Sequence, residues 1–462
     1  MHDEFILSLE NIAKRLKEAD KPIKIITHLD CDGLSAASIM IAALKREDKK
    51  FSVSVVKQIT ENALKEISHE HYEIIVFLDL GSGCANLIKD KLKKEIFILD
   101  HHMLGEKTDL IHVNPHMFGI DGNAEISGAG ISYLCAKLIN KKNVDLAHLA
   151  VIGAIGDMQE NKGFSGINKL ILDDAVKIGK IEVKNGLRMF GMQTKPIHKA
   201  LEYSTDSYIP NVTGNEAGAI EFLKELGINY KIDDEYRKIV NLNEEEMKKL
   251  ITGIILRRLG SEDNPDDVLG PIYLLKEEND EMPTKDAKEF ATLLNSCGRL
   301  LKPSLGIGTC LGDKKAKEEA IELLINYKRE LISSLDWFYK NRNKNVLEED
   351  GFVIINAGDN IKDTLIGTLL SMIAKSNFYK DGTIIIGMAN TLDNNIKISF
   401  RVAGRSKNIR LNEIAGNIGK MIGESAGGHV LAAGMGIPIE KEEKFIESAI
   451  NLLKRARIEE VV

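Results

Sequence analysis

The sequence lacks the features of a secreted, membrane-spanning or disulfide-stabilised protein. No run of apolar residues approaches the roughly 18 that a membrane-spanning helix needs. The five cysteines have no C-x-x-C spacing, which argues against a disulfide framework. The first residues include Asp3, Glu4 and Glu10 and do not follow the basic and then apolar order of a signal peptide, so we expect a cytoplasmic protein.

An excess of basic charge is also missing, because 62 Lys and Arg stand against 69 Asp and Glu and the formal net charge is −7. A basic surface is the usual signature of a nucleic-acid-binding protein. Its absence does not exclude nucleic acid, since a cluster of carboxylates at one site would itself account for several of the negative charges. Any polyanionic ligand must therefore be held by a local groove.

The length of 462 residues exceeds the size at which one hydrophobic core stops growing, so we expect two or three domains of the α/β class. The pattern predicts a first α/β domain over 1–190 and a helical connector over 191–345. That connector contains an inserted, charged accessory module at about 228–283. A smaller α/β domain is predicted over 346–462.

Short apolar runs alternate with amphipathic segments in the first domain, which predicts a parallel sheet. The predicted strands are 23–27, 51–56, 74–80, 96–99 and 111–113, and the predicted helices are 34–45, 61–67, 85–94, 128–139 (capped by Ser127) and 145–155. A helical stretch is predicted over 167–190, followed by helices at 285–301 and 315–335. The last domain is predicted to contain strands 353–356, 383–388 and 397–402 and helices 364–375, 413–422 and 442–455.

Carboxylates and imidazoles follow the predicted strands of the first domain at the point where each strand ends. This set comprises His28, Asp30, Asp32, Asp79, Asp100 and His101, and Asp157 follows the helix 145–155. Ligands of open parallel sheets bind outside the carboxyl ends of the strands. Oxygen and imidazole ligands without thiolates suit Mg²⁺ or Mn²⁺, and paired ions that share a carboxylate hydrolyse phosphate esters. The sequence therefore predicts a metal-dependent phosphodiesterase or phosphatase.

Asp30 and Asp32 flank Cys31, and in an extended segment the two carboxylates would face the same way while the thiol points away. They would then serve two adjacent ions, with Asp79 of the neighbouring strand as the bridge. Each element alone has a plain structural alternative: a capped turn for Asp30 and Asp32, a helix N-cap or a turn for Asp79, and a helix end for Asp157.

These segments resemble the motifs of the DHH phosphoesterase superfamily, and in particular the archaeal RecJ-like exonucleases of the GINS-associated nuclease type. HLDCDG (28–33), FLDLG (77–81), LDHH (99–102) and GDM (156–158) resemble the four motifs of the catalytic domain. SFR (399–401) and GGH (427–429) resemble the DHH-associated C-terminal domain, and NSCGR (295–299) resembles a RecJ element. The segments 203–206 and 213–216 resemble linker elements of the archaeal branch.

The resemblance implies two divalent ions, Mn²⁺ or Mg²⁺, that share Asp79. One set of implied ligands is His28, Asp30 and Asp79, and the other is Asp32, Asp79, His101 and Asp157. Asp100 would orient an imidazole and His102 would face the scissile phosphate. His28 departs from bacterial RecJ enzymes, which have Asp there, and a strand-end histidine bonded to the backbone is the alternative.

Six further residues are implied to bind phosphate. Arg299 is a candidate catalytic clamp, and Ser399 and Arg401 would project from one face of a strand toward a terminal 5′-phosphate. Gly427, Gly428 and His429 would form a turn that lets the backbone approach a phosphate.

The implied activity is a two-metal-dependent exonuclease that degrades single-stranded DNA, or RNA, from an end in the 5′ to 3′ direction. It would release nucleoside 5′-monophosphates in DNA replication or repair, with the GINS complex as a partner that docks on the insert. The alternatives are a short-substrate phosphoesterase, acting on oligoribonucleotides or phosphoadenosine phosphate, and a non-catalytic scaffold of the replication fork. We expect no membrane association.

Overall fold

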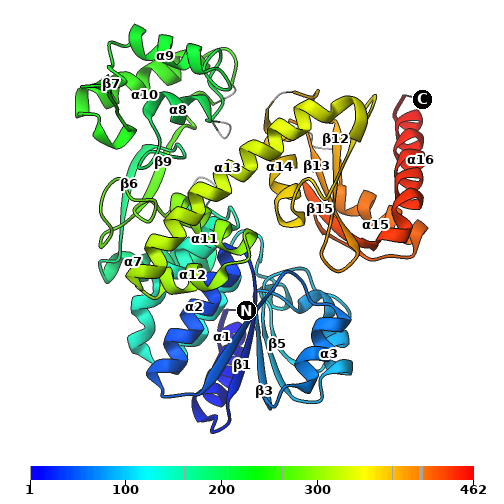
Figure 1. The fold of residues 1–462 in the computed structure, drawn as a ribbon. Coiled ribbons are helices and arrows are strands. Elements are labelled where there is room, and N and C mark those ends of the chain that lie inside the picture. Colours follow the sequence, from blue (N-terminus) through cyan, green and yellow to red (C-terminus); the bar gives the residue numbers. More distant parts are fainter. Residues whose placement is uncertain are drawn as a thin grey trace. The chain divides into compact units, whose positions relative to one another are not determined.

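The computed structural model of the chain describes residues 2–160, 163–204, 207–262, 264–376, 378–404 and 409–461. The chain divides into two compact units, Met1–Leu324 and Ile325–Val462, each built around its own sheet (Figure 1). The predicted α/β class is confirmed. In the part of the chain that is described, no helix is both long and apolar enough to cross a membrane.

The first unit contains a five-stranded sheet in which every pairing is parallel, in the order β2-β1-β3-β4-β5. Its strands are β1 (Ile23–His28), β2 (Phe51–Val56), β3 (Ile74–Leu78), β4 (Glu95–Leu99) and β5 (Ile111–Val113). All five were predicted. Because the strands are parallel, their carboxyl ends lie at one edge of the sheet, and the candidate ligands follow them there.

Helices cover both faces of this sheet (Figure 1). Leu64 of α3 and Ile88 of α4 pack on the face that carries Ile75 and Phe77, whereas α2 and α5 contact the strands and each other on the opposite face. The helices are α1 (His2–Glu18), α2 (Cys31–Arg46), α3 (Glu61–His69), α4 (Ala85–Lys91), α5 (Gly128–Ile139), α6 (Ala147–Gly156) and α7 (Gly166–Lys177). Ser127 caps α5 as predicted, since its side chain accepts a hydrogen bond from Gly130 N.

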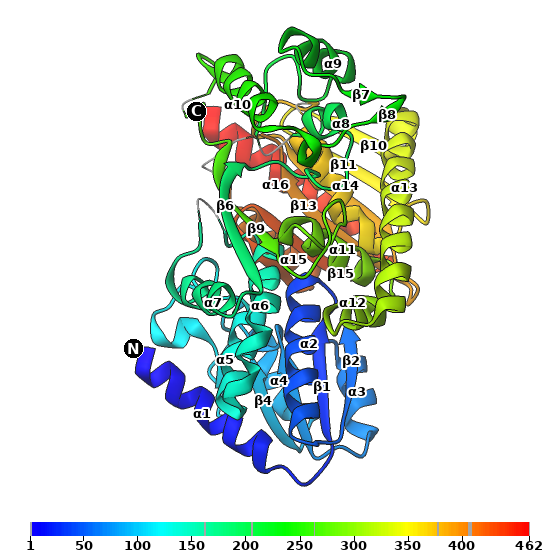
Figure 2. The ribbon, with the colours of Figure 1, turned by 90° about the vertical axis from the view of Figure 1, so that its left-hand side faces the viewer.

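The helix predicted over 167–190 is wrong in its second half. Helix α7 ends at Lys177, and β6 (Ile181–Leu187) pairs antiparallel with β9 (Leu269–Leu275). The partner strand lies beyond a complete module in the chain, so the sequence carries no local hairpin signal for it. Figure 2 shows β6 and β9 as a two-stranded ribbon that leads to this small module.

The module has its own hydrophobic core, from Leu187 to Val268. It therefore begins before the predicted border at residue 228 and ends before residue 283. It contains α8 (Ile197–Glu202), α9 (Glu216–Glu225), α10 (Glu244–Arg258) and the short strands β7 (Lys231–Ile232) and β8 (Glu235–Tyr236). The two segments with likeness to archaeal linkers meet in it, because the Ser204 and Thr213 hydroxyls lie 2.9 Å apart. Thr205 and Asp206 lie outside the described residues.

After the module the chain returns to the parallel sheet of the first unit through two helices, α11 (Ala287–Arg299) and α12 (Pro303–Cys310). Helix α11 contacts α6 and α2, and α12 contacts α2. The following helix α13 (Lys314–Asn345) is longer than the predicted segment 315–335 and runs from the first unit into the second.

The second unit has a six-stranded sheet in the order β10-β11-β12-β13-β15-β14, with only β11 and β12 parallel. Helix α14 (Asp363–Lys375) contacts β12 and β13, and a core that includes Phe400, Leu411 and Phe445 lies under α15 (Leu411–Ile422) and α16 (Glu442–Val461). The strands are β10 (Val346–Glu349), β11 (Phe352–Gly358), β12 (Ile384–Asn390), β13 (Asn395–Val402), β14 (Ala426–His429) and β15 (Ala432–Pro438). Strands β10, β14 and β15 were not predicted.

Candidate metal centre

The predicted ligands of the first unit meet at the carboxyl edge of the parallel sheet. His101 Nε2 lies 3.3 Å from Asp79 Oδ1, 3.1 Å from Asp157 Oδ2 and 3.7 Å from Asp32 Oδ2. His28 Nδ1 lies 2.8 Å from Asp30 Oδ2 and 3.7 Å from Asp79 Oδ2. Groups whose ligand atoms lie within 4.8 Å of one another are Asp32, Asp79, His101 and Asp157; His28, Asp30 and Asp79; and Asp79, His101 and His102.

Asp79 belongs to each of these groups and is buried. It follows β3 with a backbone φ of 59°, and its side chain is 1% exposed. Its N–H donates to Leu99 O of the neighbouring strand over 2.9 Å. A Cβ at Gly128, the first residue of α5, would lie 2.6 Å from Asp79 Oδ1, so only glycine lets α5 begin this close to the carboxylate. Positive φ values in non-glycine residues are concentrated at functional sites.

The expectation that Asp30 and Asp32 lie on an extended segment is wrong. Strand β1 ends at His28, and Asp30 is the N-cap of α2, accepting a hydrogen bond from Gly33 N over 3.0 Å. Asp32 lies in the first turn of α2 and is fully buried. Its carboxylate accepts hydrogen bonds from the N–H groups of Gly128 (2.6 Å) and Ala129 (3.0 Å) at the start of α5. The helical turn separates the two carboxylates, and they join different groups of candidate ligands.

His101 presents one ring nitrogen to this cluster. Its Nδ1–H donates to Gly122 O over 2.6 Å, which leaves Nε2 directed at the carboxylates. Metal-binding histidines are commonly oriented in this way by a backbone carbonyl. Asp100 belongs to no candidate ligand group among the described residues. It accepts hydrogen bonds from the backbone N–H groups of Ser82 and His101 and from His102 Nδ1, over 2.8 Å each.

The cluster is electrostatically crowded. Burial alone would lower the pKa of His101, but the Asp157 and Asp79 carboxylates outweigh it and raise that pKa well above its usual value. The same competition raises the pKa of His28, through Asp30 and then Asp79. Burial, and then the charges of Asp79 and Asp157, raise the pKa of the Asp32 carboxyl well above its ordinary value. These carboxylates repel one another unless protons or cations lie between them.

His102 lies at the rim of the cluster, with its side chain 39% exposed. Burial opposes its positive charge, but the hydrogen bond and charge of Asp100 raise the pKa of His102 to about 9. The imidazole is therefore a cation at neutral pH while Asp100 is ionised.

Several buried atoms of the cluster have no hydrogen-bond partner, among the residues that the structure describes. They include both carboxylate oxygens of Asp79. His28 Nδ1 and His101 Nε2 also make no hydrogen bond of good geometry with a described residue, although carboxylate oxygens lie 2.8 Å and 3.1 Å away. A buried polar atom without a partner costs about 1–3 kcal/mol. Carboxylate oxygens with imidazole nitrogens form the ligand set that Mn²⁺ and Mg²⁺ accept. The donor set therefore fits divalent cations, which would pair with these atoms and offset the repulsion.

Helix α11 supports the segment that carries Asp30 and Asp32. Asn295 Oδ1 accepts a hydrogen bond from Cys31 N over 3.0 Å. A Cβ at Gly298 would lie 1.6 Å from Leu29 O, so this approach also requires glycine. Arg299 is the last residue of α11 and is partly buried. Sequence reasoning found this element by its resemblance but missed the role of Asn295.

The predicted phosphate-binding residues of the second unit lie on β13 and β14. Ser399 and Arg401 point from β13 toward α14, because a Cβ at Gly367 would lie 3.3 Å from both side chains. Arg401 Nε donates to Ser371 Oγ over 2.9 Å. The predicted turn at 427–429 is wrong: Gly427, Gly428 and His429 form most of the edge strand β14, which pairs with β15 through a hairpin at 430–431.

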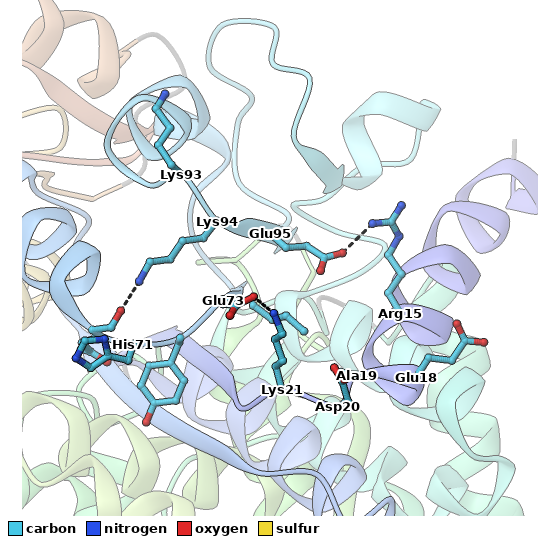
Figure 3. A pocket seen from close by; sticks show the side chains of 13 residues that line it. Arg15, Glu18, Ala19, Asp20, Lys21, His71, Glu73, Lys93, Lys94 and Glu95 are labelled. Atoms are coloured by element: carbon cyan, nitrogen blue, oxygen red, sulfur yellow. Dashed lines mark hydrogen bonds and ion pairs between the residues drawn. The ribbon is translucent and has the colours of Figure 1, made fainter.

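A depression of about 930 Å³ lies at the opposite edge of the parallel sheet, where the strands begin (Figure 3). Four of its charged residues pair with one another: Lys21 with Glu73, and Arg15 with Glu95 over 2.7 Å. The Lys94 ammonium donates to a backbone carbonyl. This surface contains none of the candidate ligands.

Comparison with known proteins agrees with the fold. Family models match residues 22–154 (DHH family, N-terminal domain), 189–268 (DHH-CID domain) and 350–455 (DHHA1 domain). The uncharacterized protein MJ0831 of Methanocaldococcus jannaschii is 30% identical over 459 residues, which cover 96% of this chain and 97% of that protein.

Several solved structures share the fold, including the following two. RecJ of Thermus thermophilus in complex with Mn²⁺ has a TM-score of 0.59 and 15% identity, covering 97% of this chain and 55% of that one, so the chain spans little more than half of that RecJ. Cdc45 of Entamoeba histolytica has a TM-score of 0.66 and 12% identity, covering 97% of this chain and 99% of that one. With its DHH, DHH-CID and DHHA1 domains in this order, the chain belongs to the DHH family of phosphoesterases.

Proposed function

We propose that the chain is a metal-dependent exonuclease that degrades single-stranded DNA, and RNA as a second substrate, from the 5′ end. The products would be nucleoside 5′-monophosphates, and the process would be DNA replication or repair. The observation that carries the proposal is the convergence of the candidate ligands on Asp79, whose carboxylate oxygens are buried without hydrogen-bond partners among the described residues. The fold shared with RecJ supports the choice of a nuclease.

Two positions for divalent ions are proposed, with Asp79 common to both. His28 and Asp30 would complete one position; Asp32, His101 and Asp157 would complete the other. When bound, Mn²⁺ or Mg²⁺ polarises a phosphate and acidifies water, which is the chemistry of phosphodiester hydrolysis.

The side chains of the protein would orient the substrate and stabilise charge. His102, held by Asp100 at Nδ1, is a cation that can donate from its other ring nitrogen to an oxygen of the scissile phosphate. Arg299 is proposed as a second cationic contact. In the second unit, Ser399 and Arg401 share one face of β13 and are proposed to bind a terminal phosphate through the hydroxyl and the planar guanidinium.

The test is a time course with single-stranded oligonucleotides labelled at the 5′ or the 3′ end, in the presence of Mn²⁺. The proposal expects immediate release of a labelled mononucleotide from the 5′-labelled strand and a descending ladder from the 3′-labelled strand. Asp79→Asn should abolish cleavage, whereas Asp174→Asn, which alters a carboxylate paired with Lys137 outside the centre, should not. A ladder from the 5′-labelled strand would reverse the proposed polarity.

A short-substrate phosphoesterase is the first alternative, because the same catalytic residues would serve it. A dinucleotide that is hydrolysed much faster than a long single strand at equal concentration would favour this reading. A non-catalytic scaffold is the second alternative, since the chain shares its fold with Cdc45 over nearly the whole of both chains. Failure of the wild type with Mn²⁺ to cut either substrate would favour the scaffold.

The GINS complex is the proposed partner, with the module between β6 and β9 as its docking surface. Leu187 and Leu269 are paired neighbours, so a short turn joining them would remove the module while leaving the ribbon closed. Capture of GINS by the full chain and not by this variant would support the proposal. Equal capture by both would place the partner elsewhere.

A further inference from the structure

Three buried polar side chains lie behind the Asp100-His101-His102 segment and belong to no candidate ligand group among the described residues. Ser82 is 1% exposed, His112 9% and Asn114 0%. Ser82 comes after β3, whereas His112 lies on β5 and Asn114 directly follows it. Strand β4, which leads into the segment, lies between β3 and β5 in the sheet. The three residues therefore flank it on both sides.

Asn114 holds the backbone of the segment. Its Nδ2 donates to His102 O and to Ser82 Oγ, over 2.8 Å each, and its Oδ1 accepts from His116 N over 3.0 Å. Both amide hydrogens are used inside the protein. A single side chain thus joins the loops that follow β3, β4 and β5.

Ser82 connects Asn114 to Asp100. Its backbone N–H donates to Asp100 Oδ2 over 2.8 Å, and its Oγ lies 2.9 Å from His112 Nε2. Because Oγ already accepts from Asn114, the Ser82 hydroxyl donates to His112 Nε2 in the arrangement that satisfies every atom. The hydroxyl, the imidazole and the amide therefore form one buried chain of hydrogen bonds.

We propose that Ser82, His112 and Asn114 are positioning residues that fix the His102 imidazole. Asn114 holds the His102 carbonyl, the Ser82 N–H holds the carboxylate of Asp100, and His112 holds the Ser82 hydroxyl. This inference rests on the proposed function, in which His102 faces the scissile phosphate. These hydrogen bonds fix the His102 ring from two sides. Asn114 holds His102 O, and the Ser82 N–H holds the carboxylate that receives His102 Nδ1–H. Loss of either contact lets the ring move without removing a metal ligand.

Asn114→Asp is the sharpest variant. The carboxylate keeps an oxygen for His116 N but has no hydrogens for His102 O or Ser82 Oγ. We expect kcat for bis(p-nitrophenyl) phosphate with Mn²⁺ to fall about 10–100-fold, the usual effect of removing a residue that orients a metal-site group, with KM changed by less than about 3-fold. Ser82→Ala, which keeps the backbone bond to Asp100, should show a smaller loss of kcat.

The second readout does not depend on activity. In Mg²⁺-loaded protein labelled with ¹⁵N-histidine, the Nδ1–H signal of His102, identified by its loss in His102→Gln, should be protected from exchange with water. Asn114→Asp should increase its exchange rate about 10-fold or more, in line with the effect of losing an orienting residue. Asn143→Asp is the matched control, since Asn143 is also fully buried and donates to Ala136 O away from the centre.

The outcomes are separable. Faster exchange in Asn114→Asp but not in Asn143→Asp, with lower kcat in the first variant alone, supports the proposal. Unchanged exchange and kcat in a folded Asn114→Asp protein overturns it, and so does an equal change in both variants, which would reflect general destabilisation. If the wild type has no phosphodiesterase activity, the proposed function fails while the exchange experiment still decides whether the three residues hold His102.

Discussion

Asp79 is predicted to destabilise the metal-free protein and to be required for stabilisation by metal. The ligand atoms of Asp32, Asp79, His101 and Asp157 lie within 4.8 Å of one another. Two unit charges at that separation repel by about 3 kcal/mol at an effective dielectric constant of about 20. The His101 imidazole and the raised pKa of the Asp32 carboxyl offset part of this repulsion. Asp79→Asn should therefore stabilise the metal-free protein by about 1–3 kcal/mol, since asparagine also tolerates the positive φ.

Thermal unfolding in EDTA and in saturating Mn²⁺ measures both contributions. In EDTA the first unit of Asp79→Asn should melt about 2–6 °C above the wild type, if 1 kcal/mol shifts a domain of this size by about 2 °C. Mn²⁺ at about 100 times its Kd should stabilise the wild type by about 2.7 kcal/mol per ion and the variant much less. Asp174→Asn, the control, loses bonds from Tyr133 and Lys137 and should melt lower in both conditions. A lower melting temperature of Asp79→Asn in EDTA, or an equal Mn²⁺ shift in both proteins, would refute the reasoning.

Three further predictions concern the surroundings of the centre. Asn295→Ala removes the acceptor for Cys31 N and should weaken Mn²⁺ binding about 10–100-fold in calorimetric titration. An unchanged Kd would show that α11 does not support the metal centre. Burial, and then the charge of Glu289, raise the pKa of Asp286 to about 7, so the folded protein favours the protonated form. The contribution of Asp286 to the free energy of unfolding is therefore largest below about pH 4. This contribution, a few kcal/mol in all, is lost as the pH rises through about 7. The melting temperature of Asp286→Asn should therefore rise relative to that of the wild type between about pH 5 and pH 8. A difference in melting temperature that does not change with pH would contradict this pKa. Arg401→Ala should raise KM for a 5′-phosphorylated strand at least about 10-fold while KM for the unphosphorylated strand stays similar; equal effects on both strands would exclude recognition of the terminal phosphate.

The sequence predicts the parallel sheet and the position of the candidate site because both depend on local patterns. Buried strands such as Ile74–Leu78 are continuous apolar runs, and the polar residues that follow them must lie at one edge of a parallel sheet. This is why Asp79, His101 and Asp157 could be placed together although many residues separate them in the chain.

Contacts between distant segments account for what the sequence did not reveal. Strand β6 pairs with a partner beyond a complete module, so nothing near Ile181 marks it as a strand. Asp30 was placed on an extended segment, although the spacing from Asp30 to Gly33 before an apolar helix is also that of an N-cap. The roles of Asn114 and Asn295 depend on single hydrogen bonds to other loops, and a sequence pattern does not show such bonds.

Manganese binding tests the central claim of the account most directly. Titration of the metal-free protein with Mn²⁺, followed by electron paramagnetic resonance, counts the bound ions and detects magnetic coupling between neighbours. If Asp79 joins two positions, the wild type should bind two ions whose spectra are coupled, and Asp79→Asn should lose the coupling together with at least one ion. Binding of a single ion, or of two uncoupled ions that Asp79→Asn leaves unchanged, would contradict the account.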